Sequence, residues 1–434
     1  MSIYRYFLPV ESYDREFDAK LLLALHLLSR NDKLIEVIVG FDKAITQILN
    51  AVKGPSILLD KSCSDIMYQS RFKPVLRQGG AISVCDEEGV NNITNNFDGL
   101  ITRFDPLAVK TLSHYYTWGE LDTDLARSAN ISDSKIKITG NPRLDLLKSE
   151  GKKFYSSLSS GLRSYFGDFY LFNENFCTET YLQDYKPPTR SYLSDDEMRK
   201  LNDTRARKRS AASLERNSFL ELFQNLVTGN KDKYFIIRPH PMSDPTFWLL
   251  NFAKSRNVSV IYRDPAEPWL FACKGLISCG CTTALQAALA NVPVYHYSNS
   301  TDSYSNSLAS NVGLKLTAST DFSNAYLNLD KDYQYASSVM QFSQSSCGLI
   351  ANHMSTLAEG IPSLSATSED FVLNLKDSSH RLAQPYEPKW REYDLSISII
   401  TTKIKSLLSS FNLNLSSLKV RKASSGVFYL SNAN

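Results

Sequence analysis

Two separate blocks of this 434-residue chain alternate short apolar runs with longer helix-like segments. In the first block, strand-like runs occur at 3–10, 34–39, 56–59, 81–85, 115–118 and 135–139. In the second block, they occur at 169–172, 234–237, 258–262, 276–278 and 294–297. Strands that alternate with helices in this way predict a parallel sheet with helices on both faces. The predicted fold class is therefore α/β, with two Rossmann-like domains.

The segments between and after these blocks set the predicted domain boundaries. We expect a first domain over 1–150, a linker over 151–168, a second domain over 169–345 and a helical tail over 346–434. Lys152, Lys153 and the serine-rich stretch 156–160 are typical of a surface linker. The amphipathic stretch 395–411 of the tail could pack across the domains or touch a membrane surface, and packing is the expectation. Two such domains predict a central cleft, with ligands at the carboxyl ends of the strands.

Charge and cysteine content exclude several classes of protein. Lys and Arg total 48 against 45 Asp and Glu, a formal charge of +3, so nucleic acid is not expected as a partner. Charges from Arg5 onward argue against a signal peptide. The sequence has no run of about 18 apolar residues, so no transmembrane helix is expected. The seven cysteines suit reduced thiols in a cytoplasm. Cys279 and Cys281 lack further ligands at zinc spacing, so no metal site is predicted.

Three consecutive acids, Asp86, Glu87 and Glu88, follow the predicted strand 81–85 and precede Gly89. The carboxyl end of a parallel strand faces the ligand crevice, and neighbouring carboxylates repel one another. At least one of the three should therefore resist ionisation, which suits a general base or a carboxylate nucleophile. The alternative is an acidic loop in solvent.

Two further motifs follow strands of the second block. Arg238-Pro239-His240-Pro241 comes after the strand 234–237, and its prolines hold His240 rigidly near a cation, as a phosphate ligand requires. The small-residue turn at Ser278 and Gly280 leads through Thr282 and Thr283 into a helix, which suits anion binding. The structural alternatives are a turn with a capping histidine and an ordinary helix N-cap.

These motifs together resemble those of bacterial surface carbohydrate biosynthesis proteins. The pattern is an acidic motif before glycine, here Glu87-Glu88-Gly89, then His240-Pro241, then Ser278 with Thr282-Thr283. It is similar to that of sialyltransferases and Kdo transferases. Longer sequence segments strengthen the resemblance. They are Leu8 to Glu11, Arg15 to Ala24, Asp86 to Gly89, Trp118 to Glu120, Thr139 to Asp145, and Arg238 to Pro241. The resemblance covers about residues 3 to 300.

The resemblance implies a GT-B fold and a metal-independent glycosyltransferase without a cofactor. It implies transfer of an ulosonic acid, such as Kdo or a nonulosonate, from a CMP-linked donor to a surface polysaccharide or lipid-linked glycan. Glu88 would then be the base or nucleophile, with Asp86 and Glu87 as neighbouring candidates. The same resemblance implies that His240 contacts the donor phosphate. The implied nucleotide-binding residues are Arg238, His240, Pro241, Ser278, Gly280, Thr282 and Thr283. Such an enzyme would work in the cytoplasm, at the inner face of the membrane.

Three other functions remain open on the sequence. One is a CDP-glycerol or polyol-phosphate transferase of the teichoic acid type. A second is a protein like the UDP-sugar 2-epimerases, which share the two-lobe architecture. A third is a non-catalytic scaffold. The nucleotide that the chain binds would separate these functions.

Overall fold

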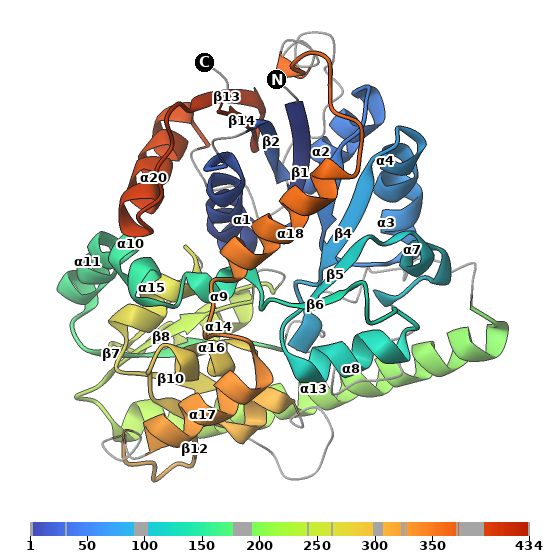
Figure 1. Ribbon diagram of the computed structural model, residues 1–434. Coiled ribbons are helices and arrows are strands. Elements are labelled where there is room, and N and C mark those ends of the chain that lie inside the picture. Colours follow the sequence, from blue (N-terminus) through green and yellow to red (C-terminus); the bar gives the residue numbers. More distant parts are fainter. Residues whose placement is uncertain are drawn as a thin grey trace. The chain divides into compact units, whose positions relative to one another are not determined.

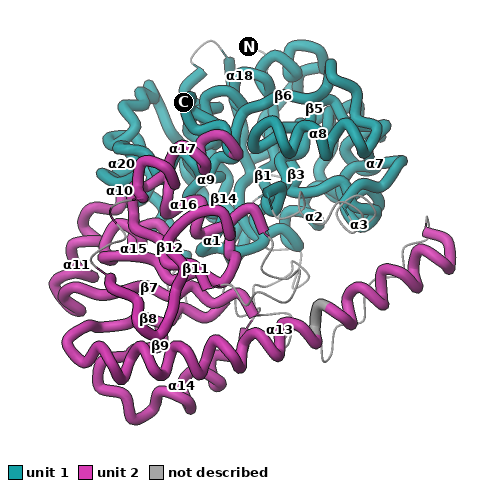
Figure 2. The backbone as a smooth tube through the Cα atoms, turned by 90° about the horizontal axis from the view of Figure 1, so that it is seen from below, with its two compact units in different colours: residues 1–154, 340–434 teal, residues 155–339 magenta. Residues whose placement is uncertain are grey.

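The structure is a computed structural model, shown in Figure 1. It describes residues 3–30, 33–90, 103–176, 193–240, 243–261, 264–297, 307–322, 326, 328–369, 372 and 395–432. The chain divides into two compact units (Figure 2). Unit 1 comprises 1–154 and 340–434, and unit 2 comprises 155–339.

The boundaries of the units differ from the predicted ones. Helices α10 (Ser149–Phe154) and α11 (Ser156–Phe166) occupy the segment predicted as a linker. Serines are tolerated there because α11 still buries Leu162 and Ser159 on one side. The segment predicted as a separate helical tail belongs to unit 1 and ends in a β-hairpin. Unit 1 is therefore built from both ends of the chain.

Unit 1 contains an eight-stranded sheet in the order β13-β14-β2-β1-β3-β4-β5-β6. Its strands are β1 (Ile3–Val10), β2 (Leu34–Phe41), β3 (Ile57–Asp60), β4 (Ala81–Cys85), β5 (His114–Thr117), β6 (Ile136–Ile138), β13 (Lys419–Ser424) and β14 (Val427–Ser431). The first six strands are parallel, and the hairpin β13-β14 adds two antiparallel strands beside β2. The chain runs outward from β1 in both directions, so the topological switch point lies between β1 and β3.

Helices of unit 1 pack on the sheet in two groups. Right-handed crossovers on either side of the switch point place α1 and α2 on opposite faces. The helices are α1 (Tyr13–Leu28), α2 (Asp42–Ala51), α3 (Asp65–Met67), α4 (Lys73–Arg77), α7 (Pro106–Thr111), α8 (Glu120–Ser128), α9 (Pro142–Asp145), α18 (Ser346–Glu359) and α20 (Ile397–Ser410), with a π-turn η1 (Tyr68–Phe72). Elements α3, η1 and α4 form one continuous helical segment over residues 65–77, and Pro74, which lacks a backbone N–H, lies in the first turn of α4 just after the π-turn. In the amphipathic tail segment, α20 packs against α1 and α10, which both belong to unit 1.

Unit 2 contains a six-stranded sheet in the order β12-β11-β10-β7-β8-β9, and every pair in it is parallel. Its strands are β7 (Phe169–Asn173), β8 (Tyr234–Arg238), β9 (Val258–Val260), β10 (Gly275–Ser278), β11 (Val294–His296) and β12 (Leu314–Lys315). The switch point lies between β7 and β10, because β8 and β9 extend the sheet one way and β11 and β12 the other. The predicted α/β class therefore holds for both units.

The helices of unit 2 include one long element. They are α11, α13 (Asp195–Gly229), α14 (Thr246–Phe252), α15 (Ala266–Ala272), α16 (Thr283–Leu289) and α17 (Leu329–Val339), with a 3-10 turn η2 (Leu308–Asn311). The helix α13 spans both the strongly charged residues 195–216 and the more apolar residues 219–227 (Figure 2). A capping box starts it, because Ser194 Oγ accepts from the backbone N–H of Glu197 and the Glu197 carboxylate accepts from that of Ser194.

An aromatic core fills one face of the unit 2 sheet. Phe172, Ile237, Ile277 and Tyr295 from four adjacent strands share one buried cluster with side chains of α13 and α14. Side chains alternate across a sheet, so the residues next to these four lie on the opposite face. Within the described residues, none of the helices is long and apolar enough to cross a membrane.

Candidate active site

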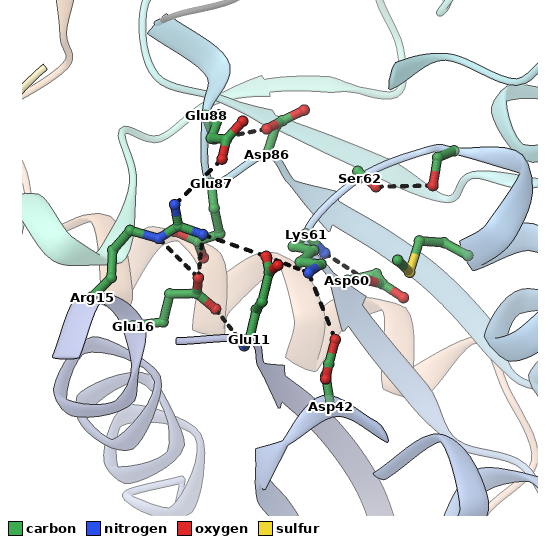
Figure 3. Close-up of polar contacts among 12 residues, drawn as sticks. Glu11, Arg15, Glu16, Asp42, Asp60, Lys61, Ser62, Asp86, Glu87 and Glu88 are labelled. Carbon is green, nitrogen blue, oxygen red and sulfur yellow. Dashed lines mark hydrogen bonds and ion pairs between the residues drawn. The ribbon is translucent and has the colours of Figure 1, made fainter. Parts of the chain in front are cut away.

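Charged side chains gather at the carboxyl edge of the unit 1 sheet (Figure 3). Glu11 directly follows β1 and Lys61 directly follows β3, so the two residues flank the switch point. The Lys61 ammonium pairs with the Glu11 carboxylate and lies 3.6 Å from Asp42 Oδ2. The Glu11 backbone N–H donates to Glu16 Oε2 at 2.8 Å. This edge is where an α/β sheet places its ligand.

The three acids after β4 are anchored by their backbone. The Trp118 indole Nε1 donates to the Asp86 carbonyl at 2.6 Å, and the Glu88 N–H donates to Asp86 Oδ1 at 2.8 Å. Gly89 is needed behind this turn, since a Cβ there would lie 2.6 Å from the Trp118 ring and 3.0 Å from Asp122 Oδ2. The turn therefore holds each carboxylate in a fixed direction.

The Glu87 carboxylate is enclosed by partners. Its oxygens lie 3.0 Å from Lys20 Nζ, 3.2 Å from Arg143 Nε and 3.2 Å from Asn141 Nδ2. Burial on its own would raise the pKa of Glu87, but the Lys20 and Arg143 cations more than offset it and lower the pKa to about 2. With 4% of its surface exposed, Glu87 is a buried ion-pair partner within the fold.

Asp86 is also buried and pairs with Arg103, whose Nε donates to Asp86 Oδ2 at 2.8 Å. Burial raises the pKa of Asp86 despite this cation. The expectation that one of the three acids resists ionisation thus holds for Asp86, with burial as the larger cause. Asp122, which the sequence analysis did not single out, is fully buried nearby, and burial raises its pKa to about 7.

Glu88 is the accessible member of the three, with 43% of its side chain exposed. One carboxylate oxygen lies 3.3 Å from Arg15 Nη1 (Figure 3), and the other lies 3.6 Å from Arg103 Nη1. The charge of Arg103 is the main cause that lowers the pKa of Glu88 to about 2, with Arg15 contributing in the same direction. Glu88 is therefore an ionised, outward-facing carboxylate at neutral pH.

Residues of the segment Thr139 to Asp145 hold the loop of three acids in place. Arg143 Nη2 donates to the Glu87 carbonyl at 2.7 Å, and the Arg143 guanidinium stacks on the Trp118 ring at 5.0 Å. Asp145 accepts from the backbone N–H groups of Ser346 and Cys347, which start α18. The role of this segment was not predictable, because a contact between residues 56 positions apart is not visible in local spacing.

At the carboxyl edge of the unit 2 sheet, the structure brings Arg238 and His240 together with an unpredicted acid. Glu174 follows β7 and accepts from the His240 backbone N–H at 2.8 Å. Arg238 ends β8, donates to the Asp264 carbonyl, and its guanidinium lies 5.6 Å from the centre of the Trp269 ring. Pro241 lies outside the described residues. The motif thus ends a strand, as predicted, while its role in binding stays a prediction.

The predicted small-residue turn connects β10 to α16. Gly280 has a φ of +80°, a conformation that favours glycine. Thr282 is the N-cap residue of α16 but makes no side-chain capping hydrogen bond, and Thr283 Oγ1 lies 3.1 Å from Cys281 Sγ. The predicted phosphate contacts of Ser278, Gly280, Thr282 and Thr283 remain predictions.

Strand register places four polar residues in one row at this edge. Asn173 pairs with both Arg238 and Ser278, and Ser278 pairs with His296. All four lie on the sheet face opposite the aromatic core. Sequence motifs mark Arg238 and Ser278, whereas Asn173 and His296 were missed because each is the last residue of a strand and belongs to no motif. Only the strand order could have revealed them.

The chain thus contains two doubly wound α/β sheets, and each sheet has polar residues at its switch point.

No protein-family model matches the chain, and no curated protein sequence matches it. Solved structures with which it aligns include UDP-GlcNAc 2-epimerase from Methanocaldococcus jannaschii, at 13% identity, over 82% of this chain and 100% of that one, with a TM-score of 0.45. UDP-GlcNAc 2-epimerase from Neisseria meningitidis aligns at 12% identity over 83% and 100%, with a TM-score of 0.47.

A third solved structure is the wall teichoic acid polymerase TagF. It aligns at 11% identity over 82% of this chain and 89% of that one, with a TM-score of 0.44. These are likenesses only, and the α/β assignment stands on the strand order of the two sheets.

Proposed function

We propose that this chain is an enzyme that acts on a nucleotide-linked sugar or polyol. The observation that carries the proposal is the state of Glu88. It is ionised, it is the accessible acid of its loop, and it lies at the strand edge where this fold places ligands. The polar residues at the edge of unit 2 supply a place for the nucleotide. The motifs that resemble surface carbohydrate enzymes supply the substrate class.

Glu88 suits chemistry in which positive charge develops on a sugar carbon. Departure of a nucleotide from an anomeric carbon produces an oxocarbenium-like centre, which a fixed carboxylate stabilises. A carboxylate with a low pKa is a weak base but stays charged throughout the reaction. The salt bridges to Arg15 and Arg103 hold it in place before the substrate arrives. In a transferase, the same group would also orient the acceptor hydroxyl.

Three specific activities are candidates for this site. Ulosonic acid transfer and sugar epimerisation both break the bond between an anomeric carbon and the nucleotide, as described above. A polyol-phosphate transfer instead breaks a phosphorus–oxygen bond, and Glu88 would then orient the acceptor hydroxyl. The sequence motifs favour a CMP-linked ulosonic acid donor for surface polysaccharide synthesis. UDP-GlcNAc 2-epimerases and a wall teichoic acid polymerase, which represent the two enzymatic alternatives, are the proteins named in the structural comparison. The requirement common to all three is a nucleotide-linked substrate, and this requirement is the function we propose. The donor is a substrate, and the proposal includes no cofactor.

The direct test is an assay of nucleotide release or sugar conversion. The full chain is incubated separately with a CMP-linked ulosonic acid, CDP-glycerol and UDP-GlcNAc, and products are followed by mass spectrometry. Turnover of one of them identifies the activity. No turnover of any, with a surface-polysaccharide acceptor present, would contradict the proposal and favour the scaffold function.

A second test concerns His240. The variant His240→Ala should bind the nucleotide about 10- to 100-fold more weakly, because a charge-assisted hydrogen bond to phosphate is worth about 1.5–3 kcal/mol. Calorimetry measures this affinity directly. His353→Ala, which removes a half-buried histidine of unit 1, is the matched control and should leave affinity unchanged. Equal nucleotide affinity in the wild type and His240→Ala would show that His240 does not contact the nucleotide.

A further inference from the structure

Three side chains in the unit 2 row carry buried polar atoms without partners. Asn173 is 7% exposed, Ser278 is 0% exposed and His296 is 6% exposed. The Asn173 Oδ1, the Ser278 Oγ and both ring nitrogens of His296 have no hydrogen-bond partner among the described residues. Each buried polar atom left unpaired costs free energy, and folded proteins pair nearly all of them. Several such atoms in one place therefore point to a ligand.

The three side chains form one continuous strip. Asn173 ends β7, Ser278 ends β10 and His296 ends β11, and these strands are neighbours in the sheet. Parallel strands lie roughly 4.8 Å apart, so the strip spans about 10 Å across the sheet. Asn173 and Ser278 also flank the switch point between β7 and β10, where doubly wound sheets bind ligands.

The chemistry of the strip excludes a phosphate group as its sole ligand. The Asn173 Oδ1 is an acceptor and needs a donor from the ligand. A neutral imidazole offers one donor and one acceptor, and a serine hydroxyl offers both. Burial lowers the pKa of His296 to about 4, so its ring is neutral at physiological pH. The ionised phosphate that links nucleoside and sugar in such a substrate has no O–H and supplies acceptors alone, whereas a nucleoside supplies hydroxyl donors, N–H donors and acceptors.

We propose that Asn173, Ser278 and His296 bind the nucleoside part of the nucleotide-linked substrate through its uncharged donors and acceptors. This inference rests on the proposed function and deepens it. It assigns ligand contacts to Asn173 and His296, which no motif marks. It also gives Ser278 a role toward the nucleoside, in place of the phosphate contact that the resemblance implied.

The test measures binding of cytidine, uridine and inorganic phosphate to the full chain by calorimetry. The variants are Asn173→Ala, His296→Ala and His296→Gln, with Asn251→Ala on the exposed surface of α14 as the matched control. We expect Asn173→Ala and His296→Ala each to weaken the preferred nucleoside about 3- to 10-fold, as loss of one neutral hydrogen bond predicts. His296→Gln keeps a donor and an acceptor, so it should restore part of the affinity. Phosphate binding should be equal in all variants.

The outcomes separate this inference from the proposed function. If the wild type binds a nucleotide but the alanine variants bind the nucleoside as tightly as the control does, the inference is overturned and internal water satisfies the strip. If phosphate binding falls while nucleoside binding stays the same, the inference is also overturned. If the wild type binds no nucleoside and no nucleotide, both the inference and the proposed function are overturned. The His296→Gln variant guards against a result that reflects misfolding alone.

Discussion

Replacing Glu88 by glutamine should lower kcat by about 10²- to 10³-fold, the usual cost of removing one group that stabilises transition-state charge. Nucleotide affinity should change little, because Glu88 acts on charge that develops in the transition state. The variant keeps the size of the side chain and removes its negative charge. Steady-state kinetics with the preferred donor measures kcat, and calorimetry measures affinity.

The matched control for this experiment is Glu120→Gln, which neutralises an exposed acid at the start of α8. It should retain full activity. Full activity in Glu88→Gln would contradict the catalytic role of this residue. If Asp86→Asn loses activity while Glu88→Gln keeps it, and Asp86→Asn remains folded, the role moves to Asp86. A sugar adduct on the Glu88 peptide, found by mass spectrometry of quenched reactions, would indicate a covalent intermediate.

Replacing Glu87 by glutamine should reduce stability far more than it reduces chemistry. Its carboxylate pairs with the buried Lys20 and with Arg143, and removal of one partner leaves a cation buried without its main counter-charge. Such losses cost about 3–5 kcal/mol. The free energy of opening, measured by hydrogen exchange of the β4 amides, reports on unit 1 directly. Glu88→Gln is the control and should cost less than about 1 kcal/mol, because Glu88 is partly exposed.

The contribution of Glu87 to the stability of the fold should decrease as the pH falls. Its pKa in the folded chain is about 2, below the unfolded value of about 4.3. A group with a lowered folded pKa stabilises the fold above its unfolded pKa, and this contribution is lost as pH falls through the folded pKa. The stability difference between the wild type and Glu87→Gln should therefore be full above about pH 5 and shrink toward pH 2. Equal losses for Glu87→Gln and Glu88→Gln at pH 7 would contradict the assignment of Glu87 as a buried ion-pair partner.

Much of the fold follows from local patterns in the sequence. Apolar runs such as 34–39 and 81–85 appear as β2 and β4, because buried parallel strands need continuous apolar residues. The hairpin β13-β14 was missed. Its first strand carries Lys419, Arg421 and Lys422, which hide its strand character. The linker prediction failed because serine content does not prevent a helix that buries one side.

The candidate site was predictable where a motif marks a strand end, as at Glu88, Arg238 and Ser278. It was not predictable where function depends on strand order, as at Asn173 and His296. Nor could spacing reveal which of three adjacent acids faces outward. That choice depends on Lys20, Arg103 and Arg143, which lie elsewhere in the chain and hold Asp86 and Glu87 inside the fold.

Binding of nucleotides to the full chain tests the central claim most directly. Calorimetric titration with CMP, CDP, UDP and GDP, under identical buffer and salt, measures whether the chain holds a nucleotide and which one. We predict saturable binding of CMP, CDP or UDP, where CMP supports the ulosonic acid transferase, CDP alone the polyol-phosphate transferase and UDP the epimerase. Absence of saturable binding for all four nucleotides at millimolar concentration would contradict the claim that this chain acts on a nucleotide-linked substrate.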